Sequence, residues 1–264
     1  SYGKTNDMLT EKFGETAVRV EGKDLRDMEP ALKDGLAGGW HYTHDAHLRS
    51  DLLMSGLKKN LLDKGVRILE NRTLTGLKEN EQGLMAETDA GEIPTKQLVL
   101  ATGALTPKLA KIVGWRAPIE PGKGYSLTMK RPGICPDIPL IFPETRVAVT
   151  PFADGYRLGS TMEFSGYDDS IHPKRLNLLR SGVEDYLKEP YAEPVTNTWY
   201  GWRPMTYDSL PIIGPCPGNP KVTLATGHNM LGLSLAPATG KLVAELLTGK
   251  APHIKAKPYS PERF

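Results

Sequence analysis

Residues 97–103 read QLVLATG, an apolar run that ends in a threonine and a glycine. Such a run, without polar alternation, is typical of a strand that is buried on both faces of a parallel sheet. We therefore expect Leu98, Val99 and Leu100 to be buried. At Gly103 the chain turns, and a glycine there lets the backbone approach a ligand closely. A plain turn from strand to loop explains the same residues if they are taken alone.

The segment before this run supports the same class. Apolar residues recur at helical spacing over residues 48–64, with Asp45 as the expected N-cap. Residues 66–69, VRIL, predict a short strand, and residues 84–93 predict a hairpin. A helix, a strand, a hairpin and a buried strand in succession predict an α/β layer.

The character changes after Gly124. A helix is predicted from Pro173 to Leu187, and it interrupts a series of short strands that we expect to be antiparallel. A sheet with this helix on one side is the simplest packing. After Gly201 the α/β pattern returns, with a strand at 222–226 and a last helix that stops at Gly249. The antiparallel strands are expected at residues 125–129, 146–150, 156–162 and 196–200.

Composition excludes several classes of protein. Apolar residues make up 39% and charged residues 24%, which suits a globular chain better than a disordered one. The net charge is only +2, without a basic run, so we expect no nucleic-acid partner. No apolar stretch approaches the roughly 20 residues that span a bilayer, so no transmembrane segment is expected. We expect a cytoplasmic protein, and a peripheral contact with the inner membrane stays open.

Metal binding is not expected. The histidines His41, His44 and His47 are spaced three apart, but neither a cysteine nor a carboxylate cluster completes a ligand set. Cys135 and Cys216 are far apart in sequence, and we expect both to be free thiols.

Two longer stretches carry the chemistry. In residues 201–214, GWRPMTYDSLPIIG, Arg203 follows a predicted strand and precedes a proline, so its guanidinium is presented from rigid backbone. A structural salt bridge is the alternative for a single arginine. In residues 227–240, GHNMLGLSLAPATG, a glycine-flanked loop leads into the last helix. A helix N-terminus of this kind offers N–H donors to a group that becomes anionic.

The order and spelling of these stretches resemble one family. The chain is similar to the D-amino-acid dehydrogenase and glycine/sarcosine oxidase family of FAD-dependent oxidoreductases. The resemblance implies an incomplete Rossmann-like FAD-binding domain over residues 47–120 and 201–264. It also implies an antiparallel-sheet substrate-binding domain over residues 1–46 and 121–200.

The resemblance also implies roles for residues. Arg203 corresponds to the arginine that clamps the substrate carboxylate, and Gly103 lies in the strand turn near the cofactor. Leu74 corresponds to a residue whose backbone touches the adenine side of FAD. The residues expected along the isoalloxazine ring are His228, Asn229, Met230, Leu231, Gly232, Leu233 and Ser234.

The implied reaction is oxidative deamination of a D-amino acid. Hydride passes from Cα to N5 of the flavin, water hydrolyses the resulting imine to a 2-oxo acid, and a quinone or oxygen serves as electron acceptor. A secondary-amine oxidase of the sarcosine and glycine type is an alternative. Met230 stands where glycine-oxidase-like members carry a second arginine, which favours a substrate with a side chain larger than hydrogen.

The sequence departs from the family in a second way. No G-x-G-x-x-G motif occurs, so we expect a fragment that lacks the N-terminal FAD-binding half. Such a chain is expected to bind FAD weakly or not at all, because no glycine-rich helix N-terminus meets the pyrophosphate. The alternative is a non-catalytic substrate domain, or a subunit that needs another chain for FAD.

Overall fold

The computed structural model describes residues 2–81 and 83–264, and these form two compact units. Unit 1 comprises Ser1–Val66, Tyr125–Thr161 and Ser170–Tyr200. Unit 2 comprises Arg67–Gly124, Met162–Asp169 and Gly201–Phe264. The mixture of helices with largely antiparallel sheets confirms the predicted fold class.

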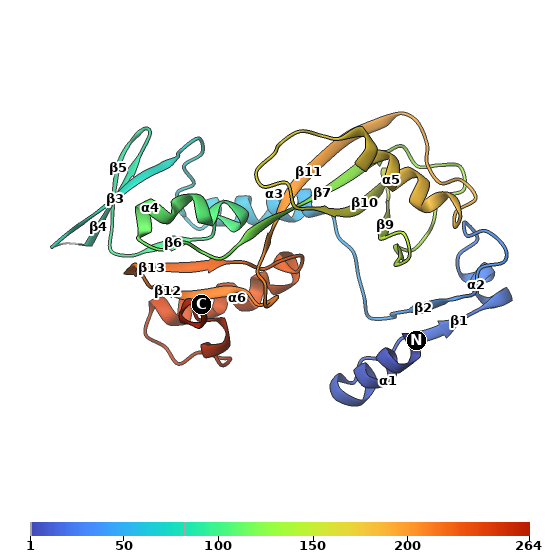
Figure 1. The fold of residues 1–264 in the computed structure, drawn as a ribbon, viewed down its shortest axis with the longest axis horizontal. Helices are drawn as coiled ribbons and strands as arrows, with labels where there is room; N and C mark the ends of the chain where they lie inside the picture. The colour runs from blue at the N-terminus through green and yellow to red at the C-terminus, as the bar shows by residue number, and fades with distance from the viewer. Residues whose placement is uncertain (1, 82) are drawn as a thin grey trace. The chain divides into compact units, whose positions relative to one another are not determined.

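Unit 1 contains most of a five-stranded sheet. The strand order is β11-β7-β10-β9-β8, and α5 lies beside these strands in Figure 1. Leu179 and Val183 of α5 are fully buried against Val147, Val149 and other sheet residues, which confirms the predicted helix on one side. The bounds are β7 Glu120–Met129, β8 Leu140–Phe142, β9 Val147–Phe152, β10 Gly155–Glu163, β11 Val195–Met205 and α5 Pro173–Glu184.

The N-terminal segment of unit 1 consists of short elements. A two-stranded antiparallel sheet, β1 with β2, lies between helices. The bounds are α1 Tyr2–Phe13, β1 Val18–Val20, α2 Gly22–Met28, β2 Gly39–His41 and α3 Ser50–Asp63.

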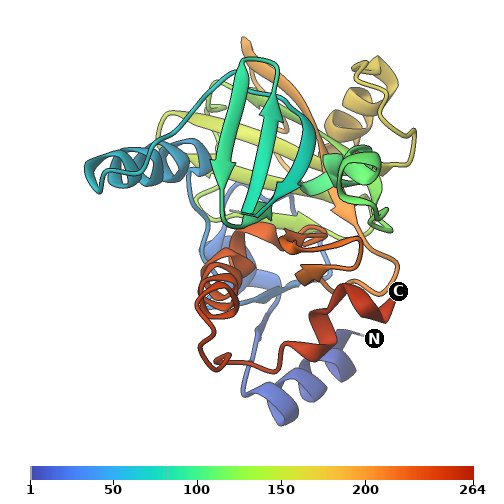
Figure 2. The ribbon, with the colours of Figure 1, turned by 90° about the vertical axis from the view of Figure 1, so that its left-hand side faces the viewer.

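Unit 2 contains two three-stranded sheets. One is the antiparallel meander β3-β4-β5, seen in blue-green in Figure 2, which includes the predicted hairpin. The other has the order β12-β13-β6, with β13 parallel to β6. The strands are β3 Leu74–Asn80, β4 Gly83–Thr88, β5 Gly91–Thr95, β6 Leu98–Leu100, β12 Ile212–Cys216 and β13 Asn219–Thr226. The helices are η1 Gly103–Leu109, α4 Ala110–Val113, α6 Gly232–Leu247, η2 Lys257–Tyr259 and η3 Pro261–Arg263.

The segment around α3 differs from the prediction at its N-cap and at residues 66–69. The helix begins at Ser50 after Arg49, so Asp45 is not its N-cap. None of its residues is buried, although its leucines recur at helical spacing. Residues 66–69 form no strand, and Val66 and Ile68 are exposed. The physical reason is that a strand needs a hydrogen-bonded neighbour, and the described residues offer none beside this segment.

The apolar run that begins the α/β layer is also less buried than predicted. Leu100 is buried, but the side chain of Val99 is 37% exposed. The expectation that both faces of this strand are covered was therefore wrong. In the described part of the chain β6 pairs only with β13, so it is an edge strand of its sheet.

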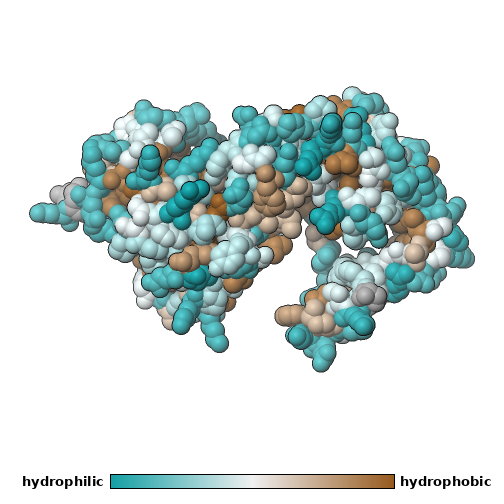
Figure 3. Space-filling view, in the orientation of Figure 1, coloured by the Kyte–Doolittle hydropathy of each residue, from teal (hydrophilic) through white to brown (hydrophobic). Residues whose placement is uncertain are grey.

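Other apolar side chains reach the surface as well. The face drawn in Figure 3 carries brown apolar patches among hydrophilic side chains. Within residues 2–81 and 83–264, no helix has the length and hydropathy that a membrane crossing requires. Cys135 and Cys216 are both free, as predicted.

Candidate active site

Arg203 lies inside β11 rather than after it, two residues from the end of the strand. Its side chain is half-buried, and the loss of water lowers the pKa of its guanidinium from the usual value. A guanidinium stays charged in a protein even so. A cation held partly away from water gains most from an anion that binds beside it.

Two glycines of β7 make room for this side chain. Gly122 and Gly124 are two residues apart, so they lie on the same face of the strand. A Cβ atom at Gly124 would lie 2.5 Å from Cζ of Arg203, and one at Gly122 would lie 2.5 Å from Sδ of Met162 and 2.8 Å from Cγ of Met205. The guanidinium and both thioether side chains therefore occupy a groove whose floor is glycine backbone.

Met162 completes this groove from β10. Nη1 of Arg203 lies 3.7 Å from Sδ of Met162. The two residues before it, Ser160 and Thr161, have φ values of 142° and 58°, which side-chain-bearing residues rarely adopt. Backbone strain of this kind collects at functional sites.

The loop after β13 is tied to the same segment through Asn229. Its backbone N–H donates to the carbonyl of Pro204 at 3.1 Å. Its Oδ1 accepts from the backbone N–H of Thr206 at 2.9 Å, and its Nδ2 donates to the carbonyl of Gly227 at 3.0 Å. These bonds hold the loop against the residues that directly follow Arg203.

Replacing Asn229 tests this anchor. Its φ of 53° is left-handed, which costs an alanine about 1–2 kcal/mol, and the lost side-chain bonds leave the Thr206 N–H unpaired. We expect Asn229→Ala to lower the free energy of unfolding by about 2–4 kcal/mol, and Asn229→Gly by about 1 kcal/mol less. Urea unfolding measures both. Equal losses in the two variants would show that the backbone conformation contributes nothing.

Gly103 follows β6, and it lies at the same end of the β12-β13-β6 sheet as the loop that follows β13. Its carbonyl accepts hydrogen bonds from the hydroxyls of Thr106, at 2.8 Å, and Thr226, at 3.1 Å. The two hydroxyls are also 2.9 Å apart, and both side chains are buried. The turn after β6 is thus fixed beside the end of β13, where the carboxyl ends of parallel strands commonly bind ligands.

The loop itself offers an apolar surface and a helix N-terminus. Met230, Leu231 and Leu233 are 66%, 57% and 47% exposed. The α6 helix begins at Gly232, and no side chain caps its first turn. Burial lowers the pKa of His228, whose Nε2 lies 2.9 Å from Oγ1 of Thr239, so the imidazole is neutral at pH 7.

These features fit one part of FAD. Exposed apolar side chains suit the face of a flat ring, and unpaired N–H groups at a helix N-terminus suit the ring edge that becomes negative on reduction. The pyrophosphate of FAD usually binds at a G-x-G-x-x-G motif, and no such motif occurs in the 264 residues.

Comparison with known proteins agrees with this geometry. The model of the FAD dependent oxidoreductase family matches residues 4–246. The chain belongs to this FAD-dependent oxidoreductase family. It is 32% identical over 262 residues to a D-amino acid dehydrogenase from Neisseria gonorrhoeae, covering 97% of this chain and 62% of the relative. A glycine oxidase from Pseudomonas putida is 33% identical over 242 residues, covering 89% of this chain and 65% of the relative.

Solved structures of similar proteins share the fold. The crystal structure of glycine oxidase from Geobacillus kaustophilus has a TM-score of 0.90 and 22% identity, covering 100% of this chain and 73% of that one. L-proline dehydrogenase from P. horikoshii has a TM-score of 0.80 and 22% identity, covering 99% of this chain and 72% of that one. The chain thus spans about three fifths of the length of the curated D-amino acid dehydrogenase it matches.

For a chain of this oxidoreductase family, the structure gathers most of the predicted site residues in unit 2. Arg203, Gly103 and residues 228–234 are linked through the bonds of Asn229 and Thr226. Leu74 begins β3 and packs against the hydrophobic core of unit 2, so its role toward adenine stays a prediction. Sequence reasoning missed the groove at Gly122 and Gly124. The sequence signal for it is GKG at residues 122–124, two glycines that share one face of a strand.

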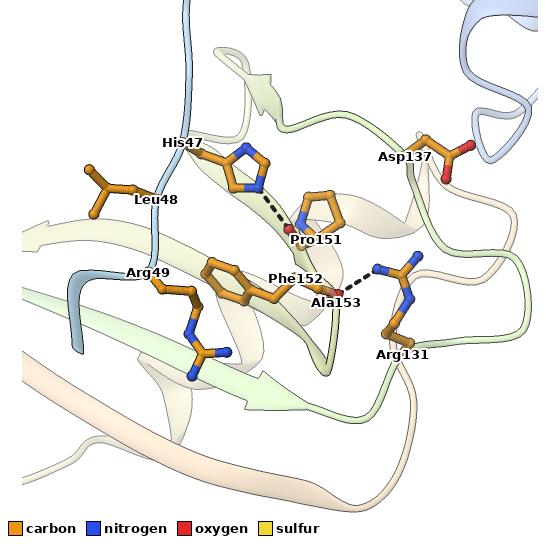
Figure 4. A pocket seen from close by; sticks show the side chains of 8 residues that line it. All are labelled: His47, Leu48, Arg49, Arg131, Asp137, Pro151, Phe152 and Ala153. Atoms are coloured by element: carbon orange, nitrogen blue, oxygen red, sulfur yellow. Dashed lines mark hydrogen bonds between the residues drawn. The ribbon is translucent and has the colours of Figure 1, made fainter. Parts of the chain in front are cut away.

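A separate cavity of about 380 Å³ lies in unit 1 (Figure 4). Its polar groups are mostly bound to the protein itself. Nε2 of His47 lies 3.1 Å from the carbonyl of Pro151, and Nη1 of Arg131 donates to that of Phe152 at 2.6 Å. Arg49 forms ion pairs with Asp51 and Asp154. The described residues contain no group of three or more metal-ligating side chains.

Proposed function

We propose that this protein takes part in FAD-dependent oxidation of D-amino acids, with Arg203 binding the substrate carboxylate. The observation that carries the proposal is the position of Arg203. Its guanidinium lies on the glycine floor of β7, and the next residue is bonded to the loop proposed to contact the flavin ring. The names of two relatives, D-amino acid dehydrogenase and D-amino-acid oxidase, support the substrate class.

Arg203 has two tasks in this proposal. Its planar guanidinium binds both oxygens of a carboxylate, so it fixes the substrate in orientation as well as in place. The half-buried surroundings strengthen that contact because they exclude water. An amino acid held this way keeps its Cα–H bond in a fixed direction, and fixed orientation accounts for a large part of enzymatic rate enhancement.

FAD supplies hydride acceptance when it is bound. The residues that would hold its ring are Gly103 and 228–234, and the N–H groups at the start of α6 would favour the negative charge of the reduced ring. The substrate loses a hydride from Cα and a proton from nitrogen. Water then converts the imine to a 2-oxo acid and ammonia. Neutral His228 adds no positive charge to this region.

The secondary-amine alternative has some support, since a glycine oxidase is among the relatives. Met230 argues against a glycine-specific site, because glycine-oxidase-like members of the family carry a second arginine at this position. Kinetics with a panel of substrates distinguish D-amino-acid oxidation from secondary-amine oxidation. The measurement uses the FAD-loaded protein purified from its own cell, with an artificial dye as electron acceptor. We expect D-amino acids to be oxidised at least tenfold more efficiently than glycine, sarcosine and L-amino acids. A preference for sarcosine would overturn the D-amino-acid assignment.

A second candidate role is that of a subunit whose FAD is gripped partly by residues outside these 264. The exposed leucines of α3 and the exposed edge at Val99 favour it, because both are surfaces that a further segment could cover. This role predicts that the chain alone elutes from gel filtration without flavin colour. A stoichiometric yellow fraction would contradict it.

A further inference from the structure

A second cavity, of about 510 Å³, lies in unit 2 beside the Arg203 groove. Its lining is mainly apolar and includes Ile119 just before β7, Phe164 just after β10, Met205 at the end of β11 and Tyr207 beyond it. The volume is in the usual range for pockets that bind small molecules.

Met205 connects this cavity to Arg203. It lines the cavity, and its Cγ lies over Gly122, while the Arg203 guanidinium lies over Gly124. The two side chains are two residues apart on β11, as the two glycines are on β7. The rise of two strand residues puts roughly 7 Å between the Cα atoms of Arg203 and Met205. A carboxylate on Arg203 thus leaves the rest of an amino acid within reach of the cavity.

We propose that this cavity receives the substrate's side chain and selects amino acids whose side chains are bulky and apolar. This proposal rests on the proposed function, because it needs the carboxylate on Arg203. Phe164 and Tyr207 are 61% and 79% exposed, so an apolar group between them covers aromatic surface that otherwise faces water.

The charges in the lining do not favour a charged side chain. Arg116 and Glu120 contribute one charge of each sign, so an acidic or a basic side chain meets an attraction and a repulsion together. Met205 is unbranched and flexible, which lets the wall adapt to aromatic and aliphatic shapes. The selection is therefore for apolar size rather than for one particular side chain.

The first test uses three carboxylates that lack the amine: acetate, butyrate and 3-phenylpropionate. NMR titration of the purified protein gives their dissociation constants. We expect affinity to rise about fourfold for each methylene that enters the cavity, with 3-phenylpropionate binding most tightly. Equal affinity for all three would overturn the cavity's role. Failure of all three to bind, or binding that Arg203→Ala leaves unchanged, would instead refute Arg203 as the carboxylate site, and the side-chain proposal with it.

Phe164→Ala tests the lining, and its exposure makes a folding defect unlikely to confuse the result. We expect about a tenfold loss of 3-phenylpropionate affinity with acetate affinity unchanged. The same tenfold change is expected in the ratio of kcat/KM for D-phenylalanine to that for D-alanine in the FAD-loaded enzyme. Phe13→Ala, a 68% exposed phenylalanine in α1, is the matched control. An unchanged ratio with both substrates oxidised would overturn this inference and leave the proposed function standing.

Discussion

Arg203→Ala is expected to lower kcat/KM toward amino acids by roughly two to three orders of magnitude. Removing one partner of a buried charge-assisted contact costs about 2–5 kcal/mol, and the substrate loses its orientation at the same time. Steady-state kinetics of the FAD-loaded enzyme measures the effect. Arg203→Lys should recover only part of the loss, since a point charge cannot reproduce a planar, two-pronged donor.

A purely structural role for Arg203 makes the opposite forecast. Stability would fall, and turnover per folded molecule would be retained. Melting temperature and turnover measured on the same variant separate the two roles. Near-normal turnover together with a large drop in melting temperature would remove Arg203 from the active site.

Gly124→Ala is expected to have the second-largest effect on activity. The added methyl group would lie 2.5 Å from Cζ of Arg203, well inside the normal contact distance, so the guanidinium must move. A displacement of about 1 Å can cost roughly a hundredfold in rate. We expect kcat/KM to fall by roughly ten- to a hundredfold, with about 1–3 kcal/mol lost from the free energy of unfolding through overpacking.

Gly159→Ala is the matched control for this substitution. Gly159 also lies in a strand, β10, and a Cβ there would meet its nearest neighbour, Cβ of Ser126, at an ordinary 3.7 Å. This variant should keep its activity. If Gly124→Ala were as active as Gly159→Ala, the groove would not position Arg203.

The parts of the fold that sequence predicted are those specified by neighbouring residues. In the hairpin at 84–93, the turn residues lie between the two paired strands β4 and β5. The helix α5 has a proline at its first position. The last helix ends with Gly249 in the left-handed conformation, at a φ of 67°. Each signal lies within a few residues of the structure that it determines.

The errors concern features that depend on distant partners. Residues 66–69 have the pattern of a short strand and Val99 that of a buried one, but strand pairing and burial both depend on what packs alongside. The groove was missed for the same reason. Gly122 and Gly124 acquire their meaning only when β10 and β11 bring Met162 and Arg203 over them, 40 and 79 residues further along. The motif predicts Arg203 as a site residue, whereas its position over Gly124 depends on the pairing of β11 with β7.

The exposed apolar face of α3 also bears on how readily this protein associates with other surfaces. Met54, Leu57 and Leu61 recur at a spacing of three and four, so they form one exposed stripe along the helix. Apolar stripes of this kind adhere to one another, to chaperones and to hydrophobic dyes. We therefore expect α3 to limit the solubility of the purified chain. We expect glutamate or lysine on this stripe to raise that limit.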